Sequence, residues 1–392
     1  MTPGARAQAA IELLDAIITA AREGGAAADT LITRYFAERR YAGSKDRRAV
    51  RDLVYRAIRA LGEVPVSGRA AMLAVLAAEE RDALFIGEGH APHPYRPGEP
   101  VAVPGVAPRW LIDRLRASGI GEADLAALVA DRAPLDVRVN TLRTSADAIR
   151  ALLGDTEGQA IDGLPDALRL PNGSDISALA GLVEVQDAGS QCVALASGAR
   201  PGMSVVDLCA GGGGKTLALA AMMDNRGHIL ATDTNRDRLS RLAPRAAAAG
   251  VEIAETRLLN PGREVEMLAD WQGRADIVVI DAPCSGTGTW RRNPEARWRL
   301  SPGELDRLAI VQARLLDVAA RLVRPQGRIT YIVCSLLDEE GPGRVEAFLG
   351  RHPQWRSAPV PPPLGRPHGL GWWLTPEQES TDGFFVATLA PS

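Results

Sequence analysis

Hydrophobic residues in the first part of the chain recur at the spacing of a helix face. Ile11, Leu14 and Ile18 mark one side of a first helix. The same three- and four-residue spacing marks a second helix at Val50, Leu53, Val54, Ala57, Ile58 and Leu61. Residues 90–108 then contain six prolines, which neither a helix interior nor a central strand tolerates. The pattern predicts an all-α domain over residues 1–89 and a proline-rich linker over residues 90–108.

Alternating strands and helices replace this pattern in the rest of the chain. Residues 109–185 combine short helices with short strands, which predicts a small α/β connecting subdomain. Further strands, rich in β-branched residues and separated by longer helical stretches, are expected at residues 204–208, 227–233, 275–281 and 327–335. This alternation predicts an α/β domain over residues 186–392 with a Rossmann-like, doubly wound parallel sheet. Such a sheet binds ligands beyond the carboxyl ends of its strands.

The composition is that of an ordinary globular protein. Of the 392 residues, 46% are hydrophobic and 24% are charged, which excludes disordered, collagen-like and disulfide-stapled chains. The four cysteines are far apart and form no CxxC pair, so no zinc or other metal site is expected. No apolar run reaches the roughly 18 residues that a membrane span needs. We expect a cytoplasmic protein that binds neither metal nor membrane, and we take it to be a monomer.

Positive charge is concentrated in one segment, although the whole chain carries a net charge of −3. Residues 31–60 hold nine basic and three acidic side chains, a balance of +6. The basic residues are Arg34, Arg39, Arg40, Lys45, Arg47, Arg48, Arg51, Arg56 and Arg59. This segment is expected to contact nucleic-acid phosphates. The alternative is a solvated helix surface with internal ion pairs.

A glycine-rich loop follows the first strand of the predicted sheet. Residues 209–216 read CAGGGGKT, and the four glycines let the backbone approach a ligand at the start of the next helix. GKT fits the end of a phosphate-binding P-loop, but Cys209 stands where that motif needs its first glycine. In a methyltransferase-type nucleoside site the second strand ends in a carboxylate that binds the ribose hydroxyls, and Asp233 has that place. The loop and Asp233 favour a methyltransferase, and a P-loop-like NTPase stays an alternative.

Two further cysteines follow neighbouring strands of the predicted sheet. Cys284 lies in DAPCSGTG after one strand and Cys334 in VCS at the end of the next, so both thiols are expected in one pocket. A thiolate can add to carbon 6 of cytosine, which makes carbon 5 nucleophilic toward an activated methyl group. A second thiol beside the first could assist its release. Cys192 is expected to be structural and Cys209 to act through its backbone.

Arginines and tryptophans are interleaved in residues 290–299, immediately after the first of these cysteine motifs. Arginine planes and indoles stack on unpaired bases, which predicts a contact with single-stranded or loop RNA. The alternative is that Trp290 and Trp298 are core anchors.

Several motifs together resemble one family of RNA-modifying enzymes. They are PRWLIDRL, RVNTLR, VQDAGSQ, LCAGGGGKT, DAPCSGTG, RRNPEARW, VCS and DGFF. Residues 186–389 look like the catalytic domain of the Sun/Nop RNA cytosine-5 methyltransferases. Residues 1–85 are similar to the NusB-like RNA-binding domain that precedes it in bacterial members. The resemblance implies S-adenosylmethionine as the methyl donor and RNA, expected to be ribosomal RNA, as the substrate.

The resemblance also implies roles for individual residues. Cys334 would be the covalent nucleophile, Cys284 would act in product release, and Asp281 would serve both catalysis and donor binding. The donor site would comprise Cys209, Ala210, Gly211, Gly212, Gly213, Gly214, Lys215, Asp233 and Asp281.

Three positions depart from the family pattern. Gly211 and Gly212 stand where the family has Ala-Pro, and Val333 stands where it has Thr. The third strand of the sheet has no acid at its end, where Asn260 is the nearest substitute. These departures motivate a second alternative, an RNA-binding or assembly protein whose donor pocket has decayed.

Overall fold

The computed structural model describes residues 1–130, 132–154 and 158–392, which form two compact units. One unit comprises Met1–Arg132 together with Thr289–Ser301. The other comprises Ala133–Gly288 and Pro302–Ser392. The chain thus returns to the first unit for a short segment after it has entered the second, which the division expected from the sequence did not include.

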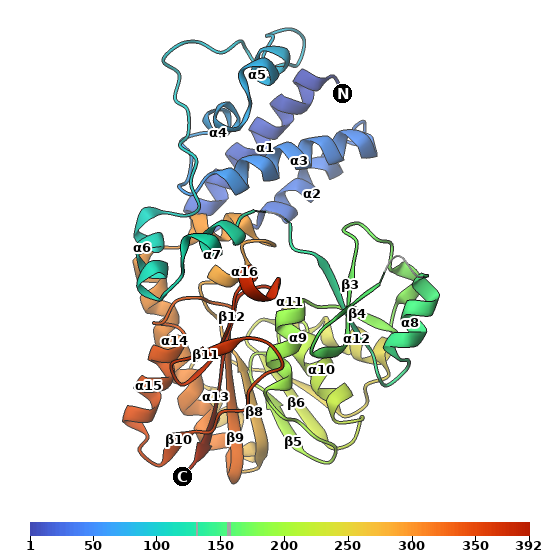
Figure 1. Ribbon diagram of the computed structural model, residues 1–392, viewed down its shortest axis with the longest axis vertical. Coiled ribbons are helices and arrows are strands. Elements are labelled where there is room, and N and C mark those ends of the chain that lie inside the picture. Colours follow the sequence, from blue (N-terminus) through green and yellow to red (C-terminus); the bar gives the residue numbers. More distant parts are fainter. Residues whose placement is uncertain (131, 155–157) are drawn as a thin grey trace. The chain divides into compact units, whose positions relative to one another are not determined.

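The first unit is built from helices, as the hydrophobic spacing predicts (Figure 1). They are α1 (Pro3–Glu23), α2 (Ala28–Glu38), α3 (Ser44–Ala60), α4 (Gly68–Val75), α5 (Ala78–Leu84), α6 (Arg109–Ala117) and α7 (Glu122–Ala127). Helix α1 begins after Thr2, whose hydroxyl accepts a hydrogen bond from the Ala5 amide, and ends at Gly24, where φ is +76°. The apolar faces of α1 and α3 share one core, and the proline-rich residues 90–108 form neither helix nor strand.

The returning segment completes the core of this unit through the 3-10 helix η4 (Pro294–Arg299). Trp290, Arg297 and Trp298 are all buried. The Arg297 guanidinium donates hydrogen bonds to backbone carbonyls at the end of α3, those of Ile58, Arg59 and Leu61, at 2.7, 2.9 and 3.1 Å. A helix end leaves such carbonyls without partners, so Arg297 supplies a cap. The prediction that these three side chains stack on RNA bases is therefore wrong, and the alternative of core anchors holds.

A small antiparallel sheet opens the second unit, in the strand order β2-β3-β1-β4. Its elements are β1 (Leu135–Val139), β2 (Gln159–Ile161), β3 (Leu164–Leu170), η1 (Ser177–Leu179), β4 (Val183–Val185) and helix α8 (Ala146–Leu153). Alternate residues of β1 point to opposite faces, so Val137 and Val139 pack with Ile149 of α8.

The main sheet of this unit has nine strands, in the order β11-β12-β13-β9-β8-β5-β6-β7 with β10 beside β13. The parallel strands are β5 (Ser204–Asp207), β6 (His228–Asp233), β7 (Ala254–Leu258), β8 (Ala275–Asp281) and β9 (Val323–Val333). They confirm the expected Rossmann-like core. The strands β10 (Trp355–Ser357), β11 (Arg366–His368), β12 (Gly371–Leu374) and β13 (Phe384–Pro391) pair antiparallel and were not expected. The connections from β11 to β12 and from β12 to β13 are too short for the crossover that parallel neighbours require.

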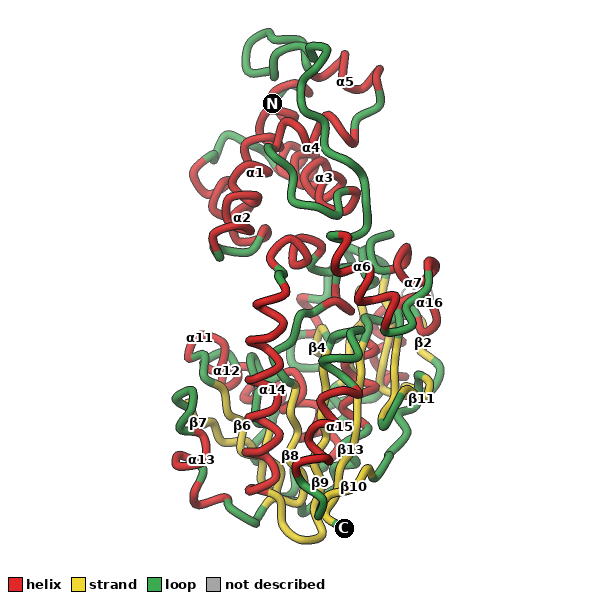
Figure 2. Tube along the Cα trace, turned by 90° about the vertical axis from the view of Figure 1, so that its left-hand side faces the viewer, coloured by secondary structure: helices red, strands yellow, loops and turns green. Residues whose placement is uncertain are grey.

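Helices cover both faces of the main sheet. They are α9 (Ala188–Leu195), α10 (Gly214–Met222), α11 (Arg236–Leu239), α12 (Leu242–Ala249), α13 (Glu264–Met267), α14 (Pro302–Leu322), α15 (Pro342–Arg351) and α16 (Pro376–Glu379), with η2 (Ala269–Trp271) and η3 (Thr287–Thr289). Helices α14 and α15 lie on one face, nearest the viewer in Figure 2, and α9 and α10 lie on the other. Strands β8 and β9 are adjacent in the middle of the sheet, so the loops after them emerge side by side.

Candidate active site

The two cysteines that follow β8 and β9 meet at the carboxyl edge of the sheet. The Sγ atoms of Cys284 and Cys334 lie 3.4 Å apart. Parallel pairing sets Asp281 opposite Ile332, which brings the ends of the two strands level. Both cysteines line one cavity of about 520 Å³. The prediction that the thiols share a pocket is confirmed as geometry.

The environment of Cys284 favours its protonated form. The contact with Cys334 and burial both raise the pKa of the Cys284 thiol well above its usual value, and the nearby Glu340 carboxylate adds to this. Burial also raises the pKa of Cys209 well above its usual value, and that of Cys192 to about 12. Neither Cys209 nor Cys192 is therefore an activated nucleophile, in line with the expected structural part of Cys192.

Lys215 points at the end of β8. Its Nζ lies 2.7 Å from Oδ2 of Asp281 and 3.3 Å from the Ser190 hydroxyl. The side chain is buried, which by itself would lower the pKa of the ammonium, but Asp281 outweighs burial and the pKa is raised. A P-loop lysine reaches the phosphates held by its own loop. The ion pair with Asp281 directs Lys215 toward the thiols instead, which disfavours the NTPase alternative.

Asp233 closes β6 and faces the glycine loop. Its two carboxylate oxygens accept hydrogen bonds from the amides of Gly211, at 2.8 Å, and Asn235, at 2.7 Å. Gly211 has φ +55° and Gly213 has φ +89°, which only glycine adopts without strain. A Cβ at Gly213 would come within 2.2 Å of Leu242. Gly211 and Gly213 are thus required by the backbone conformation and the close packing of the loop.

The remaining residues of the predicted donor site are divided between the cavity and its surroundings. Cys209, Asp233 and Asp281 line the cavity together with the two thiols. The lining does not include Ala210, Gly211, Gly212, Gly213, Gly214 and Lys215. Two of them are held by hydrogen bonds to their surroundings: the amide of Ala210 donates to the Thr232 carbonyl at 2.8 Å, and the Gly212 carbonyl accepts from Arg245.

A buried acid that the sequence reasoning missed lies at the β7 end of the cavity. Asn260, the nearest substitute in sequence, is exposed and does not line the cavity. Glu264, the first residue of α13, does line it and is 3% exposed. Its Oε1 accepts no hydrogen bond from any residue that the structure describes and lies 3.2 Å from the Arg314 guanidinium. Nothing in the sequence marks Glu264, because it follows the strand by several residues and starts a separate helix.

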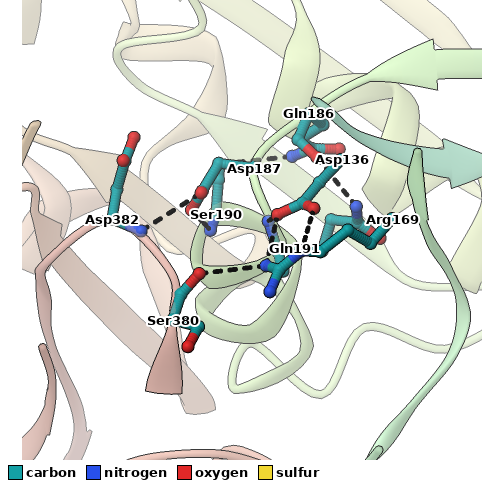
Figure 3. Close-up of polar contacts among 9 residues, drawn as sticks. Asp136, Arg169, Gln186, Asp187, Ser190, Gln191, Ser380 and Asp382 are labelled. Carbon is teal, nitrogen blue, oxygen red and sulfur yellow. Dashed lines mark hydrogen bonds and ion pairs between the residues drawn. The ribbon is translucent and has the colours of Figure 1, made fainter. Parts of the chain in front are cut away.

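Residues of the VQDAGSQ motif hold the start of α9 and a hydrogen-bond partner of Lys215 in place (Figure 3). Asp187 caps α9 by accepting a hydrogen bond from the Ser190 amide at 3.2 Å, and its other oxygen accepts from the Asp382 amide at 3.1 Å. Ser190 in turn contacts Lys215, so the cap fixes one of the partners of that lysine. Asp136 binds the Arg169 guanidinium through both oxygens, at 2.8 and 3.0 Å, within the small sheet. It also accepts a hydrogen bond from the Ala188 amide at 3.1 Å, which ties the small sheet to α9.

The DGFF turn packs directly on the first cysteine loop. The amide of Gly383 donates to the Gly288 carbonyl at 2.8 Å, and a Cβ at Gly288 would come within 2.1 Å of the Gly383 carbonyl oxygen. Phe384 places its ring 5.6 Å from Nζ of Lys215. The turn therefore supports both the loop that carries Cys284 and the side chain of Lys215.

In chemical terms, the cavity is lined by a thiol pair and by three carboxylates, those of Asp281, Asp233 and Glu264. Lys215 lies behind the lining and pairs with Asp281. Among the described residues no group of three or more His, Cys, Asp or Glu side chains is placed to hold a metal ion. No helix in the part of the chain that the structure describes is long and apolar enough to cross a membrane.

Comparison with known families gives two matches that cover most of the second unit. Residues 194–390 match the family described as 16S rRNA methyltransferase RsmB/F. Residues 107–177 match the ferredoxin-like domain described as Methyltr_RsmF/B-like.

Curated relatives and solved structures agree with these matches. A probable ribosomal RNA small subunit methyltransferase B from Synechocystis is 35% identical over 302 residues, which cover 72% of this chain and 66% of the relative. The ribosomal RNA small subunit methyltransferase B of Thermus thermophilus is 40% identical over 219 residues, 55% of this chain and 51% of the relative. The chain thus matches about half to two thirds of the length of these relatives.

Two solved structures share the fold. The crystal structure of PH0851 aligns with a TM-score of 0.78 at 24% identity, over 100% of this chain and 99% of that one. The crystal structure of NSun6 from Pyrococcus horikoshii with SFG aligns with a TM-score of 0.65 at 17% identity, over 72% of this chain and 98% of that one.

Proposed function

We propose, from the premise that this chain belongs to the RsmB/F family of 16S rRNA methyltransferases, that it methylates carbon 5 of a cytosine in ribosomal RNA with S-adenosylmethionine as donor. The names of the curated relatives point to small-subunit ribosomal RNA as the substrate. The observation that most strongly supports this proposal is the 3.4 Å contact between the Sγ atoms of Cys284 and Cys334, in a cavity that Asp233 also lines.

The two thiols have distinct parts in this proposal. The Cys334 thiolate adds to carbon 6 of the cytosine, and the electron pair of the carbon 5–carbon 6 double bond makes carbon 5 nucleophilic. Bound S-adenosylmethionine supplies the electrophilic methyl group. Loss of the carbon 5 proton to a base then restores the double bond as the bond between carbon 6 and Sγ breaks, which releases Cys334. Cys284 holds its proton in the resting site, so in its assigned part in this release it gives up that proton before its thiolate accepts the one from carbon 5.

Lys215 and Asp281 support the addition step. The buried ammonium interacts electrostatically with Cys334, and positive charge near a thiol favours the reactive thiolate. Asp281 holds the ammonium in place at 2.7 Å and lines the cavity where the base would enter. A target base must leave its stack to reach this depth, so unpaired RNA is the expected substrate form.

Two carboxylates would hold the donor. Asp233 has the position for the ribose hydroxyls, and its oxygens are already oriented by two backbone amides. Glu264 lines the cavity, and its buried Oε1 forms an ion pair with Arg314 at 3.2 Å but accepts no hydrogen bond from any described residue. A carboxylate oxygen has more than one acceptor site, so it suits the exocyclic amine of adenine. The residues present therefore fit the donor, and Glu264 takes the part for which the sequence offered only Asn260.

The alternatives are less well supported. The orientation of Lys215 toward Asp281 does not suit a phosphate-binding loop. A decayed donor pocket is disfavoured because Asp233, Asp281 and both thiols still line one cavity. We retain as proposals the domain limits at residues 89, 108 and 185, a monomeric state and a cytoplasmic location.

One experiment tests the proposed function. The protein is incubated with labelled S-adenosylmethionine and a small-subunit ribosomal RNA transcript, and digested nucleosides are identified by mass spectrometry. We expect 5-methylcytidine with the natural protein and none with Cys334→Ala. Calorimetry with S-adenosylmethionine and with ATP is the second arm, in which binding of ATP alone supports an NTPase and binding of neither supports a decayed pocket.

A further inference from the structure

A buried carboxylate lies behind the two cysteine loops. Glu340, in the turn between β9 and α15, is 1% exposed and does not line the cavity. It accepts hydrogen bonds from the Ser285 amide at 2.9 Å, the Ser335 hydroxyl at 2.6 Å, the Gln312 amide at 3.0 Å and the Ser285 hydroxyl. An ionised carboxylate has about four acceptor sites, so this set of donors fills its capacity.

The partners of Glu340 are the residues next to the thiols. Ser285 follows Cys284 directly, and Ser335 follows Cys334. Their hydroxyls lie 3.1 Å from each other and share the Oε2 atom of Glu340 as acceptor. A single carboxylate therefore fixes the backbone immediately beyond both cysteines, which belong to different strands.

The same donors tie this carboxylate to a rigid frame. Gln312, buried in α14, donates both to Glu340 and to the Pro283 carbonyl, the residue before Cys284, at 2.9 Å. The Tyr331 hydroxyl donates to the backbone carbonyl of Glu340 at 2.8 Å. The carboxylate is thus held from the helix on one side and from β9 on the other.

We propose that Glu340 is a positioning residue, which holds the Sγ atoms of Cys284 and Cys334 in contact by fixing Ser285 and Ser335. The expected effect of Glu340 on methyl transfer rests on the proposed function, whereas its effect on the distance between the two thiols does not. The Glu340 charge also contributes to the raised pKa of Cys284, which agrees with a part in keeping that thiol protonated.

The test measures how readily the two thiols meet. Diamide removes two electrons and two protons from a pair of adjacent thiols, and the resulting Cys284–Cys334 disulfide is quantified by peptide mass spectrometry. In Glu340→Ala we expect the rate of this oxidation to fall roughly tenfold or more, because small displacements of reacting groups have large effects on rate. The kcat for methyl transfer should fall roughly 100-fold, while calorimetric binding of S-adenosylmethionine, which depends on the β6 side of the cavity, stays unchanged.

Two further variants separate hydrogen bonding from bulk destabilisation. Glu340→Gln should recover part of both rates, because its amide oxygen can accept from the Ser285 and Gln312 amides while the two hydroxyls rotate to accept from its NH₂. The double variant Ser285→Ala with Ser335→Ala should reproduce the slow oxidation of Glu340→Ala. The matched control is Glu346→Gln, an exposed acid on α15 that removes the same charge and should behave as the natural protein.

The outcomes are separable. Wild-type rates of disulfide formation in Glu340→Ala, or equal losses in Glu340→Gln and Glu340→Ala, would overturn the positioning role. If Glu340→Ala does not fold, as judged by the lack of a cooperative thermal transition, the Ser285→Ala, Ser335→Ala double variant takes its place in the test. A wild-type rate of disulfide formation in that double variant would overturn the proposal. If the natural protein methylates no RNA, the proposed function fails, and the oxidation rates still test Glu340.

Discussion

Nζ of Lys215 lies 2.7 Å from Oδ2 of Asp281, which joins the helix after the glycine loop to the strand that leads to Cys284. The sequence assigned Lys215 to the donor site, yet its charged end is directed at the thiol end of the cavity. The ammonium of Lys215 also interacts electrostatically with Cys334, which favours the same orientation. The lysine is therefore better placed to activate a thiol than to hold a donor.

Substitution of Lys215 should separate chemistry from donor binding. In Lys215→Met we expect kcat to fall by roughly 100-fold or more, because the ion pair of the buried ammonium with the partly exposed Asp281 is broken and Cys334 loses its neighbouring positive charge. Calorimetric affinity for S-adenosylmethionine should change little. Lys215→Arg should not restore activity, since the ammonium lies in a buried gap between Ser190, Asp281 and Phe384.

The other lysine of the chain provides the control for that experiment. Lys45 is exposed on α3, so Lys45→Met should leave kcat at saturating RNA unchanged. A large loss of donor affinity in Lys215→Met, with kcat preserved, would contradict this assignment and return Lys215 to the donor site.

Variants of the two cysteines should trap different states. Cys334→Ala should abolish both methylation and the covalent RNA adduct, because it removes the nucleophile. Cys284→Ala should accumulate an adduct that survives a denaturing gel, because release of Cys334 is impaired. Cys192→Ala, a change at a buried thiol of α9 that does not line the cavity, is the control and should show neither effect. Loss of activity in both variants with an adduct in neither would exclude the assigned division of roles.

The thiol pair was predictable because it depends on local sequence and one topological rule. Cysteines at the ends of two strands that are adjacent in a parallel sheet must come close, and β8 and β9 are such strands. The glycine loop and Asp233 follow from the same rule. Glu340 escaped notice because its part depends on a turn that folds back behind both loops, a contact that residue spacing does not encode.

In the segment after Cys284, residues 290–299, the prediction from sequence was wrong. Arg297 looked like an RNA contact because arginine beside tryptophan suits both base stacking and a buried cap. Only tertiary structure decides between them, and Arg297 is fully buried with its guanidinium on the carbonyls that end α3. Glu264 is similar: the carboxylate at the β7 end of the cavity comes from a different element than the strand that was expected to supply it.

The basic face of the helical unit should contribute to RNA affinity through its unpaired charges. Arg51 and Arg56 already form ion pairs with Asp29 and Glu80, whereas Arg40, Lys45 and Arg48 are exposed. Reversal of Lys45 and Arg48 to Glu should weaken RNA binding several-fold at low salt and reduce the slope of log K against log salt by roughly 0.7 to 0.9 per lost phosphate contact.

The comparison for this test is Arg321→Glu, an exposed arginine at the end of α14 in the other unit. It changes the net charge by the same amount per substitution. Binding isotherms at several salt concentrations check the expectation. Equal affinity and equal salt slope in Lys45→Glu, Arg48→Glu and the natural protein would show that this face is the solvated surface weighed as the alternative.

Asp207 should make stability depend on pH in the direction opposite to that of a surface carboxylate. It is fully buried at the end of β5 and accepts a hydrogen bond from the Thr216 hydroxyl at 2.7 Å, while its Oδ1 has no hydrogen-bond partner among the described residues. Burial raises the pKa of Asp207 to about 7, although the Thr216 contact opposes this. The folded state then binds more protons than the unfolded state between about pH 4 and pH 7. The contribution of Asp207 to the free energy of unfolding therefore falls as pH rises through this window and levels off above it.

Asp207→Asn should remove that loss, because the amide stays neutral and its oxygen can still accept from Thr216. We expect the variant to gain stability over the natural protein at pH 8, on the order of 1–4 kcal/mol, and to gain roughly a third of that amount at pH 5, which lies about one pH unit into the window. Denaturant unfolding at the two pH values measures the difference, with Asp237→Asn, an exposed acid on α11, as the control. A gain that is the same at both pH values would mean that Asp207 does not change protonation on folding, and a loss at pH 8 would mean that its charge is stabilised by the loop that follows it.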